Sequence, residues 1–449
     1  MAKKIVVIGS GAAGMTAASS AREANEDAEI VVFTEEEHVS YSPCAIPFVL
    51  EGKIKDFDSI IMHTPEWYRK ERSIEVRTRT KVTGVDVDKK TIALADGTSA
   101  PYDSLVLATG GTVFVPPIEG ADLPGVHKVR FIKDGMDIQK AMASARHVVV
   151  AGAGVIGLEV AVALRHAGLE VTVVEMFPQV IPRICDADMA KEVQSYCESL
   201  GIKFVMGAPL QAIQGEGRVQ KVVAGGKEHP ADLVVMATGV RANLELPNQM
   251  GLEIGGLGAV RVSPTLQPYR KGRLMRDVFL AGDLVMCESA AAPGPTMSQL
   301  GGTGVRMGRV AGINAAGGYA TFPAVVSPWV SQIGDVQIAG TGLSCGLADY
   351  YGMSVVEGRS TGTTRARYYP GGKKLIVKLL ADRSTHRIVG GQILAGEEAT
   401  GRINWISAAI LNGATVEDFV TSYENAYCPP TSMVKDVVNR AAEDLLSKF

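Results

Sequence analysis

Cys44 is the residue of this 449-residue chain that is best placed for covalent chemistry. It follows Pro43 and precedes an apolar run, in the stretch VSYSPCAIPFVLEG that covers residues 39–52. Proline favours the first turn of a helix, where unpaired backbone N–H groups stabilise a nearby anion. The thiolate is the nucleophilic form of cysteine. We therefore expect this position to lower the pKa of the thiol and to make Cys44 a redox-active sulfur.

The other five cysteines form no recognisable metal or disulfide site. Their spacing contains neither a CxxC pair nor the paired arrangement typical of zinc, so we expect no metal. Scattered free thiols are typical of a reducing compartment, which indicates the cytoplasm. Cysteine is often buried, so four are interpreted as structural, and Cys428 is considered separately below. The five are Cys185, Cys197, Cys287, Cys345 and Cys428.

A glycine-rich turn near the N-terminus has the GxGxxG spacing of a dinucleotide site. It lies between an apolar strand at 4–8 and a helix, and a second strand follows at 29–33. In that context the glycines allow a pyrophosphate to approach the helix N-terminus. A ribose-binding acid is expected at the end of the second strand. Either Thr34 occupies that position, or Glu35 beside it is the acid. Residues 35–37 are equally consistent with a solvated turn. The turn residues are Gly9, Gly11, Ala12, Ala13 and Gly14.

A second turn of the same kind is complete. It follows a strand at 148–150 and opens a helix, and the next strand ends in Glu175, 18 residues after Gly157. Such an acid accepts from the ribose 2′-hydroxyl and repels a 2′-phosphate, so we expect NADH to be preferred over NADPH. The turn residues are Gly152, Gly154, Val155, Ile156 and Gly157.

Two further strand ends repeat the sequence Ala-Thr-Gly, which suggests two related nucleotide-binding units. One is Ala108, Thr109 and Gly110, and the other ends at Gly239. A strand ending in Gly-Asp places Asp283 at the carboxyl edge of a parallel sheet, where ligands lie. A glycine-rich helical run at 297–317 is suited to close packing against a cofactor or another helix.

Composition indicates an ordinary globular protein of two to four domains. The net charge is −3, which gives no indication of nucleic acid or an anionic membrane as a partner. We find no secretory leader and no apolar run of 18 residues, so we expect no membrane span. From about residue 322 strands come first and helices follow, which predicts an α+β domain without a nucleotide fingerprint.

Taken together, these motifs resemble the pyridine nucleotide–disulfide oxidoreductases over essentially the whole chain. The resemblance implies an α/β protein with two Rossmann-like domains, for FAD and NAD(P)H, and an α+β C-terminal dimerisation domain. The implied FAD domain is 1–115 with 245–320, the NAD(P)H domain is 116–244, and the dimerisation domain is 321–449. Asp283 then contacts the flavin ribitol, and Glu159 lies near the nicotinamide. The expected assembly is a homodimer.

The surroundings of Cys44 indicate the branch of this family. A CxxxxC pair would need a second cysteine at Val49, and a CxxC pair would need one at Pro47. The single cysteine resembles the coenzyme A-disulfide reductases, polysulfide reductases, NADH oxidases and NADH peroxidases. Peroxidases and water-forming oxidases carry a histidine in the first glycine turn, where this chain has Ala12. The resemblance also implies Pro43 beside the cofactor and Ser40 and Ser42 beside the substrate.

Two tyrosine motifs resemble those of coenzyme A-disulfide reductases, in which they approach the cysteine from the neighbouring subunit. They are Tyr368-Tyr369-Pro370-Gly371 and Tyr427-Cys428-Pro429-Pro430, with Cys428 in place of alanine. Cys428 is either a small loop residue or a second thiol that pairs with Cys44 or relays sulfur. Arg22 is the one candidate for a coenzyme A phosphate.

The sequence thus predicts an FAD- and NADH-dependent reductase of a small-molecule disulfide or polysulfide, with coenzyme A disulfide as the first choice. In this hypothesis Cys44 cycles between thiolate and a mixed disulfide, persulfide or sulfenic acid, and Tyr427 and Tyr368 (or Tyr369) protonate the leaving thiolate. A peroxide-forming NADH oxidase is one alternative. An electron-transfer reductase for a protein acceptor, with Cys44 uninvolved, is another.

Overall fold

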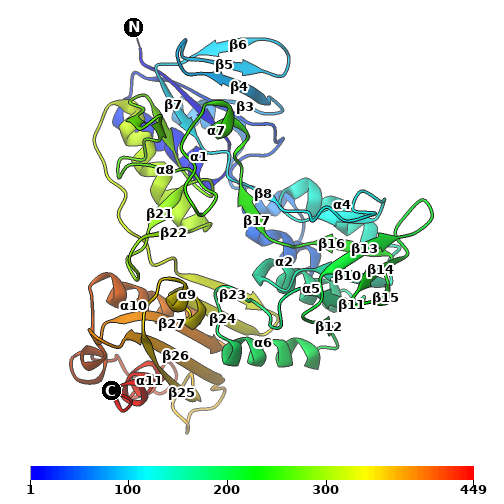
Figure 1. Ribbon diagram of the computed structural model, residues 1–449, viewed down its shortest axis with the longest axis vertical. Coiled ribbons are helices and arrows are strands. Elements are labelled where there is room, and N and C mark those ends of the chain that lie inside the picture. Colours follow the sequence, from blue (N-terminus) through cyan, green and yellow to red (C-terminus); the bar gives the residue numbers. More distant parts are fainter. Residues whose placement is uncertain (1) are drawn as a thin grey trace.

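Three lobes, each built on a five-stranded sheet, make up the computed structural model, which describes residues 2–449 (Figure 1). The first sheet is entirely parallel, in the order β20-β7-β1-β2-β3. Four of its strands are near-continuous apolar runs because both faces are covered, whereas the edge strand β3 has charged residues at both ends. They are β1 (Lys4–Ile8), β2 (Glu29–Phe33), β3 (Glu75–Arg77), β7 (Ser104–Leu107) and β20 (Val278–Leu280).

Helices α1 (Ala12–Ala24) and α8 (Gly301–Ala316) pack tightly on each other in this first lobe. A Cβ at Gly308 would collide with the carbonyl of Ala13, and one at Gly312 with that of Ala17. The glycines are therefore required for the two backbones to approach. The predicted glycine-rich helix is confirmed, and its packing partner is another helix.

The second lobe repeats the arrangement with the order β12-β11-β10-β16-β9, again parallel. Its sheet consists of β9 (Val126–Lys128), β10 (His147–Ala151), β11 (Glu170–Val174), β12 (Lys203–Val205) and β16 (Leu233–Met236). Its helices are α4 (Ile132–Met142), α5 (Val155–His166) and α6 (Ala187–Ser199). The antiparallel pair β8 (Gly111–Val113) and β17 (Val240–Ala242) connects the first two lobes.

The third lobe contains an antiparallel sheet of order β23-β24-β27-β26-β25, as predicted for an α+β domain. The strands are β23 (Trp329–Ile333), β24 (Val336–Gly342), β25 (Val355–Thr363), β26 (Lys374–Asp382) and β27 (Ile388–Ala395). The helices are α9 (Cys345–Tyr350), α10 (Ala399–Leu411) and α11 (Val437–Leu446). Between α10 and α11 the chain forms a π-helix, η3 (Asp418–Ser422).

The remaining elements are short, and most of them belong to the first two lobes. The helical ones are η1 (Pro43–Ala45), α2 (Ile46–Leu50), η2 (Asp58–Ile60), α3 (Pro65–Arg72) and α7 (Glu245–Gln249). Two three-stranded sheets consist of β4 (Val82–Asp86), β5 (Thr91–Leu94) and β6 (Ser99–Pro101), and of β13 (Leu210–Gln214), β14 (Lys221–Ala224) and β15 (Lys227–Pro230). Two hairpins pair β18 (Tyr269–Arg270) with β19 (Arg273–Leu274), and β21 (Met286–Glu288) with β22 (Pro295–Met297). Among residues 2–449 no helix has both the length and the apolar character needed to cross a bilayer.

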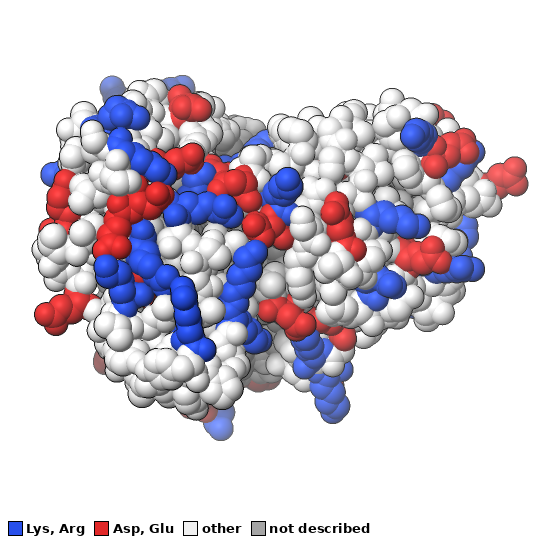
Figure 2. All heavy atoms as spheres, turned by 90° about the horizontal axis from the view of Figure 1, so that it is seen from below, with Lys and Arg blue, Asp and Glu red and all other residues white. Residues whose placement is uncertain are grey.

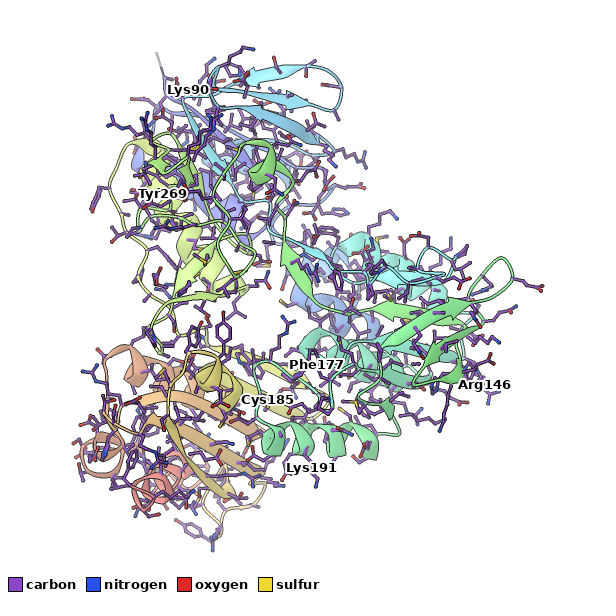
Figure 3. The ribbon with its side chains drawn as sticks, in the orientation of Figure 1. Lys90, Arg146, Phe177, Cys185, Lys191 and Tyr269 are labelled. Atoms are coloured by element: carbon purple, nitrogen blue, oxygen red, sulfur yellow. The ribbon has the colours of Figure 1, made fainter. Side chains whose placement is uncertain are left out.

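A buried ion cluster, the Lys378 cluster, joins the second lobe to the third. Lys378 of β26 is only 4% exposed, and its Nζ lies 3.1 Å from Asp186, 3.0 Å from Asp188 and 2.5 Å from Glu357. Asp186 also accepts from the side chain of Gln392 at 2.9 Å. Figure 3 labels Cys185 and Lys191, which mark the start of α6 against the third lobe. The cluster fixes the second lobe relative to the C-terminal sheet.

Candidate active site

Cys44 lies in the 3₁₀ turn η1, immediately before the short helix α2. The apolar side of α2 packs on α4 and α5, which fixes the turn against the second lobe. His166 at the end of α5 hydrogen-bonds Glu51, which follows α2, at 2.6 Å. Cys44 lines the same cavity as Val155 and Ile156 at the N-terminal end of α5. Cys44 is thereby brought next to the second glycine turn.

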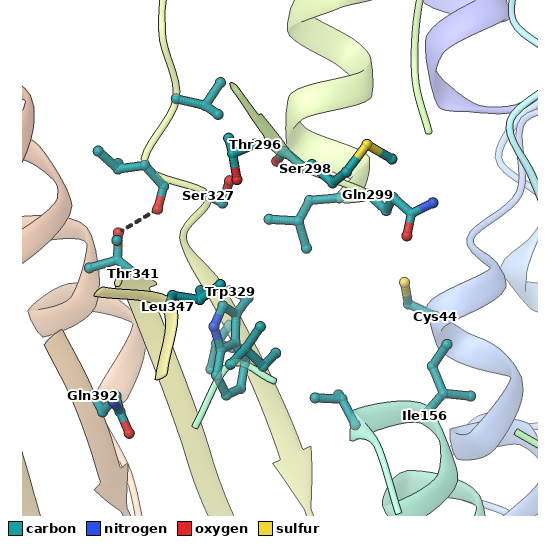
Figure 4. A pocket seen from close by; sticks show the side chains of 18 of the residues that line it. Cys44, Ile156, Thr296, Ser298, Gln299, Ser327, Trp329, Thr341, Leu347 and Gln392 are labelled. Atoms are coloured by element: carbon teal, nitrogen blue, oxygen red, sulfur yellow. Dashed lines mark hydrogen bonds between the residues drawn. The ribbon is translucent and has the colours of Figure 1, made fainter. Parts of the chain in front are cut away.

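The Cys44 side chain faces a cavity of about 490 Å³ where the three lobes meet (Figure 4). The second lobe contributes Ile156 and Glu159, and the third contributes Trp329 and Leu347. Gln299, just before α8, faces the sulfur across the cavity in Figure 4. The lining is mainly apolar, so a bound group here is shielded from water and its charges act strongly.

The predicted lowering of the Cys44 pKa is wrong for the single chain. Burial raises the pKa of the thiol, and the Glu159 carboxylate raises it further. The Arg130 guanidinium lowers it, and Asp283 adds a smaller opposing effect. Burial and the Glu159 carboxylate, neither of which the sequence shows, outweigh the small helix dipole of the three-residue turn η1.

Glu159 is the most strongly perturbed carboxyl group of the cavity. It lies on α5, and its Oε1 accepts a hydrogen bond of 2.7 Å from the hydroxyl of Ser331 on β23. Burial raises the pKa of Glu159 to about 7, and the Ser331 hydrogen bond lowers it only in part. Near neutral pH this residue therefore exists in both protonation states, which is typical of a group that exchanges protons.

Replacing Glu159 with glutamine is expected to stabilise the protein at pH 8 but not at pH 5. The pKa of Glu159 is raised in the folded state, so its ionisation opposes folding, and wild-type stability falls as pH rises from about 4.5 through about 7. The shift corresponds to up to roughly 3 kcal/mol. Urea unfolding of both proteins at the two pH values measures the effect. An equal difference at both values would contradict it.

A second cavity, of about 430 Å³, lies along the first glycine turn and fits a dinucleotide cofactor. Gly9 has φ +108°, and a Cβ at Gly14 would collide with the Gly9 carbonyl, whereas one at Gly11 would meet nothing. Helix α1 begins at this open position without a side-chain cap, so its free N–H groups face an anion site. Thr109 Oγ1 at the same cavity is buried without a hydrogen-bond partner. FAD would supply hydride-accepting chemistry there, held by these residues.

The two glycine turns superimpose in register, which places Thr34 where the second unit has Glu175. Ile8 pairs with Phe33 just as Ala151 pairs with Val174, and the next residues are Thr34 and Glu175. Thr34 bonds Ser10 at 3.0 Å, and Glu35 is exposed. Of the two alternatives for the first unit, Thr34 therefore has the equivalent position.

In the second unit the acid is buried within the turn. Glu175 is 6% exposed and accepts from the backbone N–H groups of Ala153 at 2.7 Å and Phe177 at 2.9 Å. A Cβ at Gly157 would collide with the Gly152 carbonyl, and Gly154 caps α5 without a side-chain bond. The N-terminus of α5, like that of α1, is therefore not covered by a capping side chain. Val155 and Ile156 of that start line the Cys44 cavity.

Arg130 and Glu36 are site residues that sequence reasoning missed. Arg130 lines both cavities and donates to Asp283 at 2.9 Å, so the predicted ribitol carboxylate is held by a cation from the second lobe. Glu36 lines the second cavity and accepts from the Tyr41 hydroxyl, and burial raises its pKa. For residues 35–37 the sequence left open a ribose-binding acid at Glu35 or a solvated turn, and only the fold shows that Glu36 lines the cavity.

The structure places the two predicted tyrosines together, away from Cys44 of the same chain. The hydroxyls of Tyr368 and Tyr427 hydrogen-bond each other, and both side chains are exposed. Cys428, next to them, is also exposed. None of the three lines the described cavity that contains Cys44. Within one chain, Cys44 and the tyrosine pair are therefore separate.

The three predicted substrate-binding residues have structural contacts. Ser40 has φ +48° and bonds the hydroxyl of Tyr68 at 2.6 Å, and Ser42 precedes η1. The Arg22 guanidinium donates to the backbone carbonyls of Arg72 at 3.1 Å and Ser73 at 2.8 Å. These contacts give Arg22 a role in joining α1 to the end of α3, and they favour that role over phosphate binding.

Comparison with known proteins agrees with this site. Residues 3–307 match the model of the pyridine nucleotide-disulphide oxidoreductases, and residues 331–436 match the dimerisation domain of that family. The chain is 45% identical to an NADH oxidase of Methanocaldococcus jannaschii, over 99% of each chain. It is 35% identical to an NAD(P)H coenzyme A polysulfide/persulfide reductase of Pyrococcus horikoshii, over 97% of each. The solved NAD-dependent persulfide reductase of A. fulgidus has a TM-score of 0.94 and 31% identity, covering 99% of this chain and 83% of that one.

The chain therefore belongs to the pyridine nucleotide–disulfide oxidoreductase family. It is an oxidoreductase whose cofactors are FAD and NAD(P)H. The predicted family, branch, fold class, enzyme class and cofactors are confirmed.

Proposed function

We propose that this protein is an NADH-dependent reductase of small disulfides, polysulfides or persulfides, and that Cys44 is its one reacting sulfur. The observation that carries the proposal is the free Cys44 thiol in a mainly apolar cavity, beside the start of helix α5 and its glycine turn. The relatives named as polysulfide and persulfide reductases support this class of substrate. Coenzyme A disulfide remains a candidate of the same chemistry.

In the proposed reaction the Cys44 thiolate attacks one sulfur of the substrate disulfide. A mixed disulfide forms on Cys44, the substrate S–S bond breaks, and one thiolate leaves. Bound FAD and NADH would supply the two electrons that release the second thiolate and restore Cys44. The Arg130 guanidinium favours the charged form of Cys44.

We propose a homodimer in which the tyrosine pair of one subunit faces Cys44 of the other. The match to the family dimerisation domain supports the assembly, and the exposure of Tyr368 and Tyr427 leaves their hydroxyls free to meet a second chain. There they would donate a proton to the leaving thiolate. Small molecules fit this enclosed site better than a protein acceptor. On the face in Figure 2 Lys and Arg are interspersed with Asp and Glu, without the single basic surface that would attract an acidic partner.

NADH oxidase activity is the second candidate, since the relative with 45% identity bears that name. Neither described cavity is lined by a histidine, and Ala12 occupies the first glycine turn where the water-forming enzymes carry one. We therefore expect any oxidase reaction to yield peroxide.

One experiment separates these functions. NADH consumption is followed anaerobically with coenzyme A disulfide, glutathione persulfide or polysulfide, and aerobically with oxygen alone, where peroxide is assayed. The proposal predicts faster anaerobic turnover with one of the sulfur substrates than aerobic turnover without them. Oxygen consumption that exceeds turnover with all three would overturn it and favour the oxidase.

Replacing Glu175 with alanine is expected to raise the KM for NADH about tenfold or more. The change leaves the N–H groups of Ala153 and Phe177 without their buried acceptor, a loss worth roughly 1–3 kcal/mol. Removal of the negative charge also lessens the repulsion of a 2′-phosphate, so the ratio of NADH to NADPH efficiency should fall. Steady-state kinetics with both nucleotides test this, with Glu170→Ala, a partly exposed carboxylate at the start of β11, as the control. An unchanged ratio would show that Glu175 does not set the preference.

A further inference from the structure

The turn η1, which contains Cys44, is fixed on its C-terminal side by the packing of α2, but no helix precedes it. The two residues before η1 pair instead with a neighbouring segment. Tyr41 forms an antiparallel bridge with Ile61, and the Ser42 N–H donates to the Ile60 carbonyl at 3.2 Å. This pair is too short to hold the turn by backbone bonds alone, so side-chain contacts determine where Cys44 lies.

The side chains of this extended segment leave it in opposite directions, as expected for successive residues of a strand. The Ser40 hydroxyl bonds the Tyr68 hydroxyl of α3 at 2.6 Å. The partly buried Tyr41 hydroxyl instead donates to the Glu36 carboxylate. A hydrogen bond to a carboxylate is stronger than one between neutral groups. Tyr41 is therefore held more firmly than Ser40, on the side of the flavin cavity.

A continuous chain of hydrogen bonds connects the first glycine turn with Tyr41. Ser10, between the first two glycines, donates to the Thr34 hydroxyl at 3.0 Å, and the same hydroxyl oxygen accepts from the Glu36 N–H at 3.2 Å. The Glu36 carbonyl accepts from the Arg79 N–H at 3.0 Å. Glu36 is thus fixed through its backbone on both sides, and its carboxylate is a rigid acceptor for the Tyr41 hydroxyl.

Tyr41 also contacts the second lobe. Its ring packs against the apolar cluster that surrounds α4 and α5, while its hydroxyl bonds Glu36 of the first lobe. Arg130 lines both cavities, and its guanidinium lowers the pKa of the Glu36 carboxyl group and of the Cys44 thiol, so it lies near both. The Tyr41–Glu36 hydrogen bond therefore lies where the two lobes and the two cavities meet.

We propose that Tyr41 is a positioning residue for Cys44, and that its hydroxyl, bound by Glu36, holds η1 at the boundary between the two cavities. The proposal rests on the proposed function in one respect, that Cys44 is the reacting sulfur. Loss of the hydroxyl leaves the ring in place but frees the N-terminal side of the turn. Cys44 then spends less time facing its cavity and more time in contact with solvent.

The test compares the two halves of the reaction in Tyr41→Phe. Anaerobic stopped-flow absorbance should show flavin reoxidation by the disulfide slowed at least about tenfold, as for loss of a hydrogen bond to a charged group. Flavin reduction by NADH should stay within about threefold of the wild type, because it does not involve Cys44. Alkylation of Cys44 by iodoacetamide, measured by mass spectrometry of its peptide, should be at least about threefold faster in the thiol-reduced holoenzyme.

Glu36→Ala should slow the same step, and adding Tyr41→Phe should cause little further loss, because both changes remove one bond. Glu36→Gln keeps a carbonyl acceptor and should lose less than Glu36→Ala. Tyr196→Phe is the matched control, since the Tyr196 hydroxyl accepts from the Asp335 N–H at 2.7 Å and Tyr196 lines neither described cavity. It should leave all three rates unchanged.

Wild-type rates of alkylation and flavin reoxidation in Tyr41→Phe would overturn the proposal. Losses that multiply in the double variant would also overturn it, because the two groups would then act separately. If Tyr41→Phe does not retain flavin, the comparison of Glu36→Gln with Glu36→Ala decides, and equal losses would count against the hydrogen bond. Alkylation needs no substrate, so a wild type without disulfide turnover would contradict the proposed function while alkylation still tested the position of Cys44.

Discussion

Replacement of Cys44 by serine is expected to lower disulfide or polysulfide turnover by at least about 10³-fold, as for loss of a covalent nucleophile. A serine hydroxyl is not ionised at neutral pH and cannot form a disulfide, whereas the thiol sits free in the cavity. The variant should retain its flavin, because the residues of the second cavity are unchanged. NADH should still bleach the flavin absorbance. Anaerobic steady-state assays with the sulfur substrates, together with stopped-flow absorbance, measure both effects.

Cys428→Ser is the matched control, since Cys44 and Cys428 are the two exposed thiols of the described chain. If Cys428 is only a small loop residue, turnover in this variant stays within about threefold of the wild type, as is usual for a surface change. An equal loss in both variants would instead show that the two sulfurs act together. Full disulfide turnover in Cys44→Ser would contradict the mechanism. It would favour the alternative of an electron-transfer reductase in which Cys44 takes no part.

Lys378→Met is expected to lower the free energy of unfolding by about 3–5 kcal/mol, the usual cost of removing one partner of a buried ion cluster. Lys378 and Asp186 are both nearly inaccessible to water, so methionine leaves the Asp186 carboxylate buried without its cation. Asp188 and Glu357 are more exposed and lose less. Urea unfolding followed by tryptophan fluorescence measures the change, with excess FAD in all samples.

Lys191→Met is the control for the loss of a positive charge, since Lys191 is exposed on α6 beside the cluster. It should change stability by less than about 0.5 kcal/mol. Adding Asp186→Asn to Lys378→Met should recover part of the loss, because the uncompensated charge is then removed. Wild-type stability in Lys378→Met would mean that the lobes are fixed by apolar packing alone.

Local patterns in the sequence were sufficient to predict the two glycine turns, their strands and helices, and the position of Cys44. These features depend on backbone geometry over a few residues, such as the collision that a Cβ at Gly14 would cause with Gly9. The inward turn of Glu36 was not predicted, because a run of three glutamates looks the same whether or not one of them faces a cavity.

Contacts between lobes could not be predicted from one sequence. Arg130 meets Asp283 across 153 positions, and Glu159 meets Ser331 across 172. No local periodicity encodes such pairs. The error in the Cys44 pKa has the same origin, since the sequence shows the proline and the apolar run but not the carboxylate of Glu159 nearby. Electrostatics at this site depends on the assembled fold.

The order of strands in the first lobe has a consequence for synthesis on the ribosome. Its sheet is complete only when β20 joins β7, and α1 is covered only when α8 has been made. The second lobe needs no strand beyond Met236, whereas α8 ends at Ala316, 80 residues later. At about 5–20 residues per second this is a delay of roughly 4–16 s. The nascent chain can therefore complete the sheet of its second lobe well before the N-terminal segment meets β20 and α8.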